Sequence, residues 1–363
     1  MKSRSIDKFF LIVCISLVIY GFLIFFSASL GMTARTNLNI YSVIAKQLIV
    51  GLIGGGALLM VALSVNIKFW RKNAFFIGIV ALFLTALVFV PHIGFEHGGA
   101  KRWIDIGPFI FQPGEFLKIA FIIYYASWLS GVKNSKDNFK SKLIPLIILL
   151  SITGLIFLLQ PDTDGFLVLA FSGILMYLSA GGEWKHVLYL FLIAMIGMGV
   201  LFLERPYIKD RIMTYVNFGS TDSLSSGYQL DQSLIAIGSG GLTGRGFGKS
   251  IQKFQFLPEP MGDSIFAVAS EEFGFLGAAF LIILFVLFAL RGLVIAKRSE
   301  SLFGALVVIG VIAHITSQSF INISAMLGLL PLSGIALIFV SQGGTSLMAA
   351  LFEVGLVLSV SKL

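Results

Sequence analysis

The chain alternates long apolar runs with short polar connections. Ten runs of 17 to 27 residues stand out, and each approaches or exceeds the ~20 residues that a transmembrane helix needs. They cover residues 9–30, 46–65, 74–91, 114–131, 143–160, 165–181, 186–204, 264–290, 302–324 and 333–358. The runs are too long and too continuously apolar for the strands of a membrane barrel. The pattern predicts an all-α polytopic membrane protein with ten transmembrane helices.

Composition supports this class. The chain is 57% hydrophobic and only 12% charged, about half the charged fraction of a soluble domain. Its single cysteine, Cys14, lies within the first apolar run, which excludes a disulfide framework and a thiolate metal cluster. The basic N-terminus followed by an apolar run resembles a signal peptide. That run is too long for one, so we expect an uncleaved first span.

Basic residues gather in the connections on one side of the predicted spans. These are Lys2, Arg4, Lys8, Lys68, Arg71, Lys72, Lys133, Lys136, Lys140, Lys142, Lys185, Arg291, Lys297, Arg298 and Lys362. The short loops on the other side hold only Arg35, Lys46, Lys101 and Arg102. The positive-inside rule therefore places both termini in the cytoplasm. The net charge of +8 follows from this topology and does not indicate nucleic acid.

The same topology places one large loop outside the cytoplasm. This loop, about residues 205–263, joins the seventh and eighth predicted spans. Its own basic residues do not overturn the orientation, because long loops translocate largely regardless of charge. We expect one integral membrane domain over residues 1–363.

The most polar stretch of the chain, residues 227–277, begins in this loop and runs into the eighth predicted span. The segment 232–241 is short and apolar and suits a re-entrant or interfacial helix. Six glycines between 238 and 248 predict a flexible turn. Gly248-Lys249-Ser250 lacks the spacing of a phosphate-binding P-loop, and such a loop would lie on the side where nucleotide is found.

Asp263 ends this stretch where the loop meets the eighth span. One interpretation is an N-cap of that helix. The other is a carboxylate at the outer membrane surface, beside basic groups, which suits a general base. Glu259, four residues earlier, is its only close acidic neighbour in the sequence.

Ionisable residues near the fourth span form a second candidate site. Glu115 and Lys118 are three residues apart on a predicted helix and can pair. Such a pair stabilises a bundle, or lines a polar cavity that meets substrate. Arg102, just before them, is either an interfacial anchor or a clamp for a lipid headgroup phosphate.

Other polar groups within the spans have open roles. Glu271 and Glu272 follow Asp263 on the predicted helix, and pairing with a basic group of a neighbouring span is the simplest interpretation. Span nine carries His314, Gln318 and Asn322, which we interpret as interhelical hydrogen bonders. Glu353 is another candidate partner for a buried Lys or Arg. Pro161 ends one helix, and Asp162 or Asp164 can cap the next.

Taken together, the motifs resemble the SEDS family (FtsW and RodA), bacterial membrane glycosyltransferases that polymerise peptidoglycan. The matching pieces, in the family's order, are Gly99–Trp103, Gln112–Lys118, Gln160–Asp162, Tyr228–Gly248, Leu257–Gly277, Asn322–Pro331 and Ser341–Leu347. Seven separate pieces on ten predicted spans make this resemblance specific.

The resemblance implies a substrate, lipid II, and a reaction at the outer face of the bacterial cytoplasmic (inner) membrane. Asp263 occupies the position of the family's essential aspartate, Glu115 and Lys118 match its span-four pair, and Arg102 matches the basic residue of its second outward loop. We expect Asp263 to deprotonate the acceptor 4-hydroxyl. That oxygen then attacks the donor's anomeric carbon, and the lipid diphosphate leaves with inversion.

This chemistry also indicates which groups should assist the reaction. The leaving group needs its charge stabilised, and Arg102, Lys253 or a divalent cation (Mg²⁺ or Mn²⁺, with Asp263 as a possible ligand) could do this. Glu259 is a further expected substrate contact, and no organic cofactor is expected. The resemblance implies a class B penicillin-binding protein as partner, docked on spans eight and nine and the large loop, and other divisome or elongasome membrane proteins.

The chain departs from the family pattern at several positions. Gly262-Asp263-Ser264 replaces the common Thr-Asp-Phe, and Gly114 replaces Ser or Ala. Ile338 stands where Pro is usual, which should straighten the tenth helix, and Gln342 stands where Tyr is usual. The compact run before Leu257 favours the division-type FtsW branch over RodA.

Two rival functions remain open at this stage. A transporter that moves lipid II across the bilayer would use the same buried charged residues. The fixed carboxylate at one face argues against it, since a transporter has no obvious need for that. A non-catalytic scaffold that recruits a transpeptidase is the third possibility.

Overall fold

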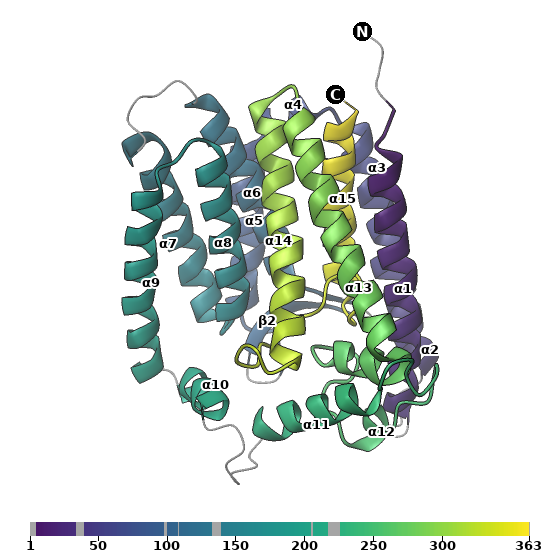
Figure 1. The fold of residues 1–363 in the computed structure, drawn as a ribbon. Helices are drawn as coiled ribbons and strands as arrows, with labels where there is room; N and C mark the ends of the chain where they lie inside the picture. Colours follow the sequence, from purple (N-terminus) through teal and green to yellow (C-terminus); the bar gives the residue numbers. More distant parts are fainter. Residues whose placement is uncertain are drawn as a thin grey trace.

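The computed structural model describes residues 5–33, 40–97, 100–107, 109–132, 139–204, 206–216 and 226–362. The long helices stand side by side in one bundle (Figure 1). The first and last helices meet at one end of it, where the Asp7 amide donates to Ser361 Oγ across 3.1 Å. The small sheet and the loop helices lie at the opposite end (Figure 1).

Each predicted span contains a long helix. In chain order the long segments are α1 (Lys8–Thr33); α2 (Ile40–Lys46), η1 (Gln47–Gly54) and α3 (Gly55–Ser64); α5 (Ala74–Ala86) with η2 (Leu87–Phe89); α6 (Pro113–Gly131); η3 (Phe139–Leu143) with α7 (Ile144–Leu159); α8 (Thr163–Ser179); α9 (Trp184–Glu204); α13 (Ile265–Arg298); α14 (Leu302–Met326); and α15 (Gly344–Ser361). The short helices are α4 (Ile67–Lys72), α10 (Pro206–Val216), α11 (Ser226–Ser239) and α12 (Gln252–Gln255).

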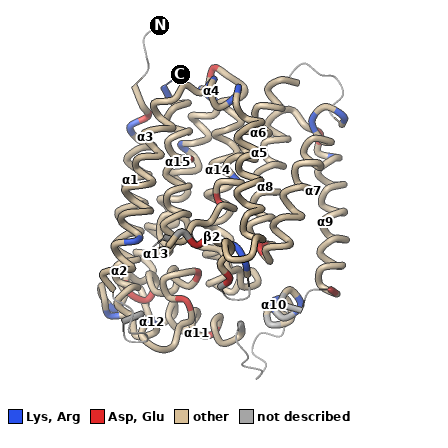
Figure 2. The backbone as a smooth tube through the Cα atoms, turned by 180° about the vertical axis from the view of Figure 1, so that it is seen from behind, with Lys and Arg blue, Asp and Glu red and all other residues tan. Residues whose placement is uncertain are grey.

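Seven helical segments within the described residues are long and apolar enough to cross a membrane, and two further apolar helices, Ala74–Phe89 and Thr163–Ser179, are shorter. A multi-pass membrane protein is therefore confirmed, and the number of ten spans stays a prediction. The charged segments gather toward the two ends of the bundle and leave long uncharged stretches between them (Figure 2). Lys2, Arg4, Arg35, Lys133 and Lys136, used for the topology, lie outside the described residues.

The prediction of an all-α fold is wrong in one loop. Between α5 and α6 the chain forms three antiparallel strands, β1 (Gly94–His97), β2 (Ala100–Ile106) and β3 (Phe109–Phe111), in the order β1-β2-β3. A short hairpin is a weak sequence signal beside strong apolar runs. The β3 end continues into Gln112, directly before α6.

The predicted start of the tenth span is also wrong. Residues 331–343 are not helical, and α15 begins at Gly344. The expectation that Ile338 straightens a helix fails for the same reason, because Ile338 lies before the helix. The apolar pattern alone could not separate this buried irregular segment from helix.

A break divides the predicted eighth span. Gly274 has φ 65° and ψ −165° within α13, a conformation that glycine adopts without steric cost. Residues 265–273 therefore form a short helix at the loop end, and the longer part of α13 continues from 275. This break is where the glycine-rich loop docks.

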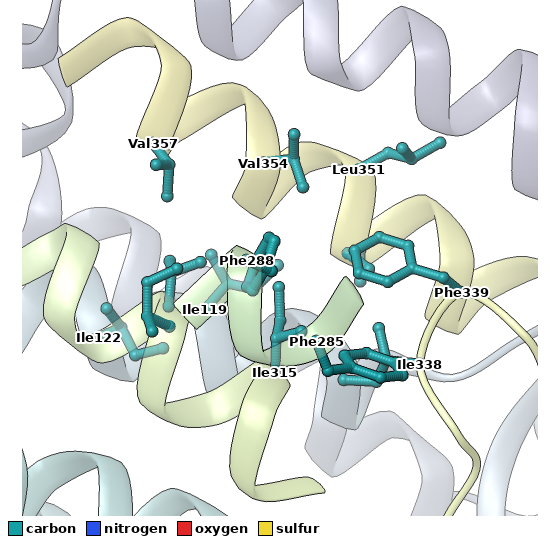
Figure 3. Packing of buried hydrophobic residues seen from close by; sticks show 14 of the residues in the cluster. Ile119, Ile122, Phe285, Phe288, Ile315, Ile338, Phe339, Leu351, Val354 and Val357 are labelled. Carbon is teal, nitrogen blue, oxygen red and sulfur yellow. The ribbon is translucent and has the colours of Figure 1, made fainter. Parts of the chain in front are cut away.

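The core lies where α6, α13, α14 and α15 meet. Ile119 and Ile122 come from α6, Phe285 and Phe288 from α13, and Ile338 and Phe339 from the irregular segment (Figure 3). Small residues allow close approach here: a Cβ at Gly310 would lie 2.6 Å from Ile122 Cγ2. The segment 331–343 is thus packed into the bundle and not left as a surface loop.

Candidate functional site

The turn before α13 carries Asp263. Three consecutive backbone carbonyls of this turn accept hydrogen bonds from other segments of the chain. Gln342 N donates to Met261 O across 2.7 Å. Ser341 Oγ donates to Gly262 O across 2.6 Å, and Asn322 Nδ2 donates to Asp263 O across 2.8 Å. The irregular segment before α15 and the side of α14 therefore fix this turn together.

The turn has a strained backbone at Glu259. This residue has φ 43°, in the left-handed region that non-glycine residues rarely adopt. Its carbonyl accepts from the amides of Gly262 and Ser264 across 3.0 and 3.3 Å. Strain of this kind persists only where the surroundings over-determine it, often at functional sites.

Asp263 lies one residue before the helix N-cap, which is Ser264. Burial raises the pKa of Asp263 to about 6; a hydrogen bond from Gln229 opposes this rise and the nearby Glu259 carboxylate adds to it. Its Oδ1 is buried and has no hydrogen-bond partner among the described residues. A carboxylate with a pKa near neutrality and an oxygen free to accept a hydrogen bond suits a general base.

A polar cavity of about 430 Å³ lies beside this turn, with Glu259 and Gly262 in its wall. Further walls come from α2 and η1, from the sheet, and from the start of α15. The polar lining side chains include Lys46, Gln47, Trp103, Gln112, Gln342 and Thr345. Amide, hydroxyl and charged groups together suit a sugar or phosphate ligand better than an apolar one.

Gln47 connects two walls of this cavity. Its Nε2 donates to Ser341 O across 3.4 Å, and its Oε1 accepts from the Gly343 amide across 3.1 Å. Gln47 opens the π-helical segment η1, and such segments are frequent at functional sites. The segment that holds the Asp263 turn is thereby fixed on its other side.

Glu115 and Lys118 form the predicted pair. Lys118 Nζ lies 2.9 Å from Glu115 Oε2 and also donates to Gln318 Oε1 across 3.0 Å. Both side chains are buried. Gln318 in turn donates to Ala336 O across 3.1 Å, so this pair is connected to the irregular segment that holds the Asp263 turn.

Arg102 binds the hairpin between α7 and α8. Its guanidinium donates to Gln160 O across 3.2 Å and to Pro161 O, and lies 3.6 Å from Asp162 Oδ1. Asp162 caps α8 by accepting from the Gly165 amide across 3.3 Å, as predicted. Arg102 thus joins the β2 strand to the 160–162 hairpin, and a role as headgroup clamp would compete with these contacts.

Lys253 does not face the cavity. It is fully buried on α12, with its ammonium 2.6 Å from Glu272 Oε1 and 2.9 Å from Ser27 Oγ of α1. An ammonium that is already paired and enclosed is not positioned to reach a leaving diphosphate. We therefore correct the expectation that Lys253 contacts substrate.

Glu271 and Glu272 pair with basic residues of the loop and not with a basic residue of a neighbouring span as expected. From a neighbouring span, Ser27 Oγ of α1 donates to Glu272 Oε2 across 2.5 Å. Glu271 accepts from Ser250 Oγ across 2.5 Å and from the Ile251 amide across 2.9 Å. Arg245 lies 3.4 Å from the same carboxylate. The two glutamates hold residues 245–253 against the short helix 265–273.

The glycine-rich turn is docked on the break in α13 and is not a flexible hinge. Arg245 N and Gly246 N donate to the carbonyls of Glu271 and Glu272 across 3.0 Å each. A Cβ at Gly244 would lie 2.1 Å from Glu272 O. The glycines of this turn allow the two backbones to approach closely. The prediction of a flexible turn, which rested on the number of glycines alone, was therefore wrong.

One pair within the bundle was predicted with the wrong partner. Glu353 pairs with His314 Nδ1 across 2.9 Å, not with a Lys or Arg. Sequence reasoning also missed Gln47 and Lys46 in the cavity wall. Lys46 is a basic residue at the outer end of its span, which is the signal that could have found it.

The described residues contain no group of three or more His, Cys, Asp or Glu that could hold a metal ion. Magnesium is commonly bound through one or two carboxylates together with substrate phosphates. The buried, unpartnered Oδ1 of Asp263 and the nearby Glu259 carboxylate fit that arrangement better than they fit a dedicated protein cage.

Known proteins resemble the whole chain. Stage V sporulation protein E of Bacillus subtilis (strain 168) is 36% identical over 361 residues, covering 99% of this chain and 98% of the relative. The probable peptidoglycan glycosyltransferase FtsW of Geobacter sulfurreducens is 34% identical over 355 residues, covering 98% and 95%.

Solved structures share the fold. One, described as the structural coordination of polymerization and crosslinking by a peptidoglycan synthase complex, superposes with a TM-score of 0.81 at 26% identity and covers 98% of this chain and 97% of the other. The rod shape determining protein RodA of Thermus thermophilus gives 0.70 at 26% identity, covering 98% and 96%. The FtsW/RodA/SpoVE family of cell cycle proteins matches residues 7–363. The chain belongs to this SEDS family.

Proposed function

We propose that this chain is a peptidoglycan glycosyltransferase that polymerises lipid II into glycan strands at the outer face of the cytoplasmic membrane. The observation that carries the proposal is Asp263, which has a pKa of about 6 and a buried carboxylate oxygen without a hydrogen-bond partner among the described residues, in a turn that borders a polar cavity. The names of the relatives support the same reaction class.

Asp263 acts as the general base in this proposal. It takes the proton of the acceptor sugar's 4-hydroxyl, and that oxygen forms a bond to the donor's anomeric carbon. The bond from this carbon to the diphosphate oxygen breaks, and the lipid diphosphate leaves with its electron pair. Direct attack inverts the anomeric centre, because no enzyme carboxylate forms a covalent intermediate.

The cavity residues hold the substrates. Lys46 is a cation in the cavity wall, and Gln47, Gln112 and Glu259 offer polar groups for sugar hydroxyls and phosphate oxygens. A divalent cation bound by Asp263 and Glu259 would neutralise charge on the leaving diphosphate. The buried pair Glu115–Lys118 supports the site through Gln318 and Ala336.

A class B penicillin-binding protein is the proposed partner, docked on α13, α14 and the large loop between α9 and α13. Large apolar side chains of α13, including Phe275, Phe280 and Ile283, are exposed along one side of the helix, as a helix–helix contact in the membrane would use. We place the chain in cell division, with elongation as the alternative setting.

Purified protein in liposomes containing lipid II tests the proposal. Polymer made by the wild type and lost in Asp263→Asn supports it. Movement of lipid II across the bilayer without polymer, lost in Lys118→Met and retained in Asp263→Asn, would show a transporter instead.

A further inference from the structure

One face of α14 carries three buried polar side chains at intervals of four residues. His314, Gln318 and Asn322 are each at most 2% exposed. Residues four apart lie one above the other on a helix, so the three form a stripe. Each binds a different element: His314 binds α15, Gln318 binds α6, and Asn322 binds the turn before α13.

Asn322 uses both amide hydrogens. One N–H donates to Asp263 O across 2.8 Å and the other to Ile335 O across 2.9 Å. The amides of Ala267 and Val268 both donate to Ser264 O. The first carbonyl that the backbone hydrogen bonds of α13 use is therefore that of Ser264, one residue after Asp263. The carbonyl of Asp263 is therefore satisfied from α14 and not from its own helix.

These bonds fix the residue that bears the reactive carboxylate. Ser341 and Gln342 hold the two carbonyls before Asp263, and Asn322 holds that of Asp263 itself. The carbonyl carbon of Asp263 is bonded to its Cα, and Cα carries Cβ. A hydrogen bond that fixes the carbonyl therefore also fixes the position from which the side chain starts. Asn322 also joins this point to Ile335, within the segment that carries Ser341 and Gln342.

We propose that Asn322 is a positioning residue that sets the direction of the Asp263 carboxylate toward the polar cavity. This inference rests on the proposed function, since it assigns Asn322 a role in that reaction. Without the amide, the turn keeps its bonds to Ser341 and Gln342 but Asp263 gains freedom. A displacement on the order of 1 Å can cost about 100-fold in rate.

Gln318 supplies a matched control. It lies on the same stripe, is equally buried, and donates to the neighbouring carbonyl of Ala336 across 3.1 Å, but no bond from it to the 261–263 turn is seen among the described residues. Asn322→Leu and Gln318→Leu each remove one buried amide from α14. Gln318→Leu also removes the acceptor of Lys118 Nζ, so it should disturb the bundle at least as much as Asn322→Leu.

The experiment measures thermal stability, kcat, KM for lipid II and the acidic limb of the pH–rate profile for both variants. We expect Asn322→Leu to lower kcat about 100-fold, with KM changed less than about threefold, and to move the acidic limb. Gln318→Leu should leave that limb in place and lower kcat less than about tenfold. Asn322→Ser keeps one hydrogen-bond donor and should give an intermediate kcat. This variant tests the inference if Asn322→Leu does not fold.

Equal losses of kcat in Asn322→Leu and Gln318→Leu, with both acidic limbs unmoved, would overturn the inference. So would full activity in Asn322→Leu. The proposed function fails separately, when the wild type makes no polymer or Asp263→Asn polymerises normally.

Discussion

The side-chain amide of Asn322 donates to the backbone carbonyl of Asp263 across 2.8 Å. Residue 322 lies near the end of α14 and residue 263 lies just before α13, so this bond closes the site between two neighbouring helices. The turn it fixes carries a strained Glu259 and a partly open Asp263 carboxylate. The predictions below follow from this arrangement.

The rate of polymerisation should depend on the charge state of Asp263. A general base must be deprotonated, and the pKa of Asp263 is raised to about 6. We expect kcat/KM to fall tenfold for each pH unit below about 6, with a half-maximal point well above that of an ordinary aspartate. A pH–rate profile on lipid II checks this. An acidic limb near pH 4 would contradict it.

Asp263→Asn should stabilise the protein at neutral pH. Burial disfavours the charged carboxylate in the folded state, which raises its pKa from 3.8 to about 6. Between these values the folded protein therefore binds more protons than the unfolded protein, and above pH 6 the ionised group costs on the order of 3 kcal/mol of stability. Below pH 3.8 the difference vanishes. Thermal unfolding of both proteins at pH 7.5, 5.5 and 4 should show a Tm gain for the variant that shrinks as the pH falls. A Tm difference that grows toward pH 4 is the opposite sign and would contradict the argument.

Lys253→Met should strongly destabilise the loop. The change leaves the buried Glu272 carboxylate without its cation, and breaking a buried pair in this way costs about 3–5 kcal/mol. The double variant Lys253→Met/Glu272→Gln removes the uncompensated charge and should recover much of this loss. Thermal unfolding of the two single variants and the double variant gives the coupling free energy. Purely additive losses would show that the pair is not coupled.

Gly244→Ala should be far more harmful than Gly238→Ala. Gly244 has φ +80° and its Cβ would lie 2.1 Å from Glu272 O, whereas a Cβ at Gly238 meets nothing within 4 Å. Gly238 lies within α11, where alanine should stabilise the helix by about 0.5–1 kcal/mol. Limited proteolysis of residues 240–257 measures the effect. Equal protection of the two variants would mean that the turn is a hinge after all.

Arg102→Lys should lower stability more than substrate affinity. The guanidinium bonds two carbonyls of the hairpin and lies beside Asp162, and an ammonium cannot reproduce that fork. We expect a lower Tm with KM for lipid II changed less than about threefold. A large rise in KM with unchanged Tm would restore the headgroup-clamp interpretation.

Most of the helices could be predicted from the sequence, because long apolar runs are a direct indication of membrane-spanning helices. The pair Glu115–Lys118 and the cap Asp162 were predictable for a similar reason, since both depend on residues close together in the chain. The sheet was not predictable, because short strands are a weak signal beside strong apolar runs. The segment 331–343 was not predictable, because its hydrogen bonds come from residues far away in the chain. Gln47, for example, reaches Ser341 and Gly343 across almost the whole chain.

The candidate site was predictable in its centre and not in its surroundings. Asp263 stood out as a carboxylate at the end of a polar loop. Lys253 was expected to contact substrate, and Glu272 was expected to pair with a basic group of a neighbouring span. In the structure these two buried residues form an ion pair with each other. The sequence shows which residues carry charge, and only the packed structure shows which charges are already neutralised.

Polymerisation of lipid II by the purified protein together with its penicillin-binding partner tests the central claim most directly. The wild type should make glycan polymer, and Asp263→Asn should make none while it retains its fold and its partner. Polymer of normal length and rate from Asp263→Asn would contradict the account.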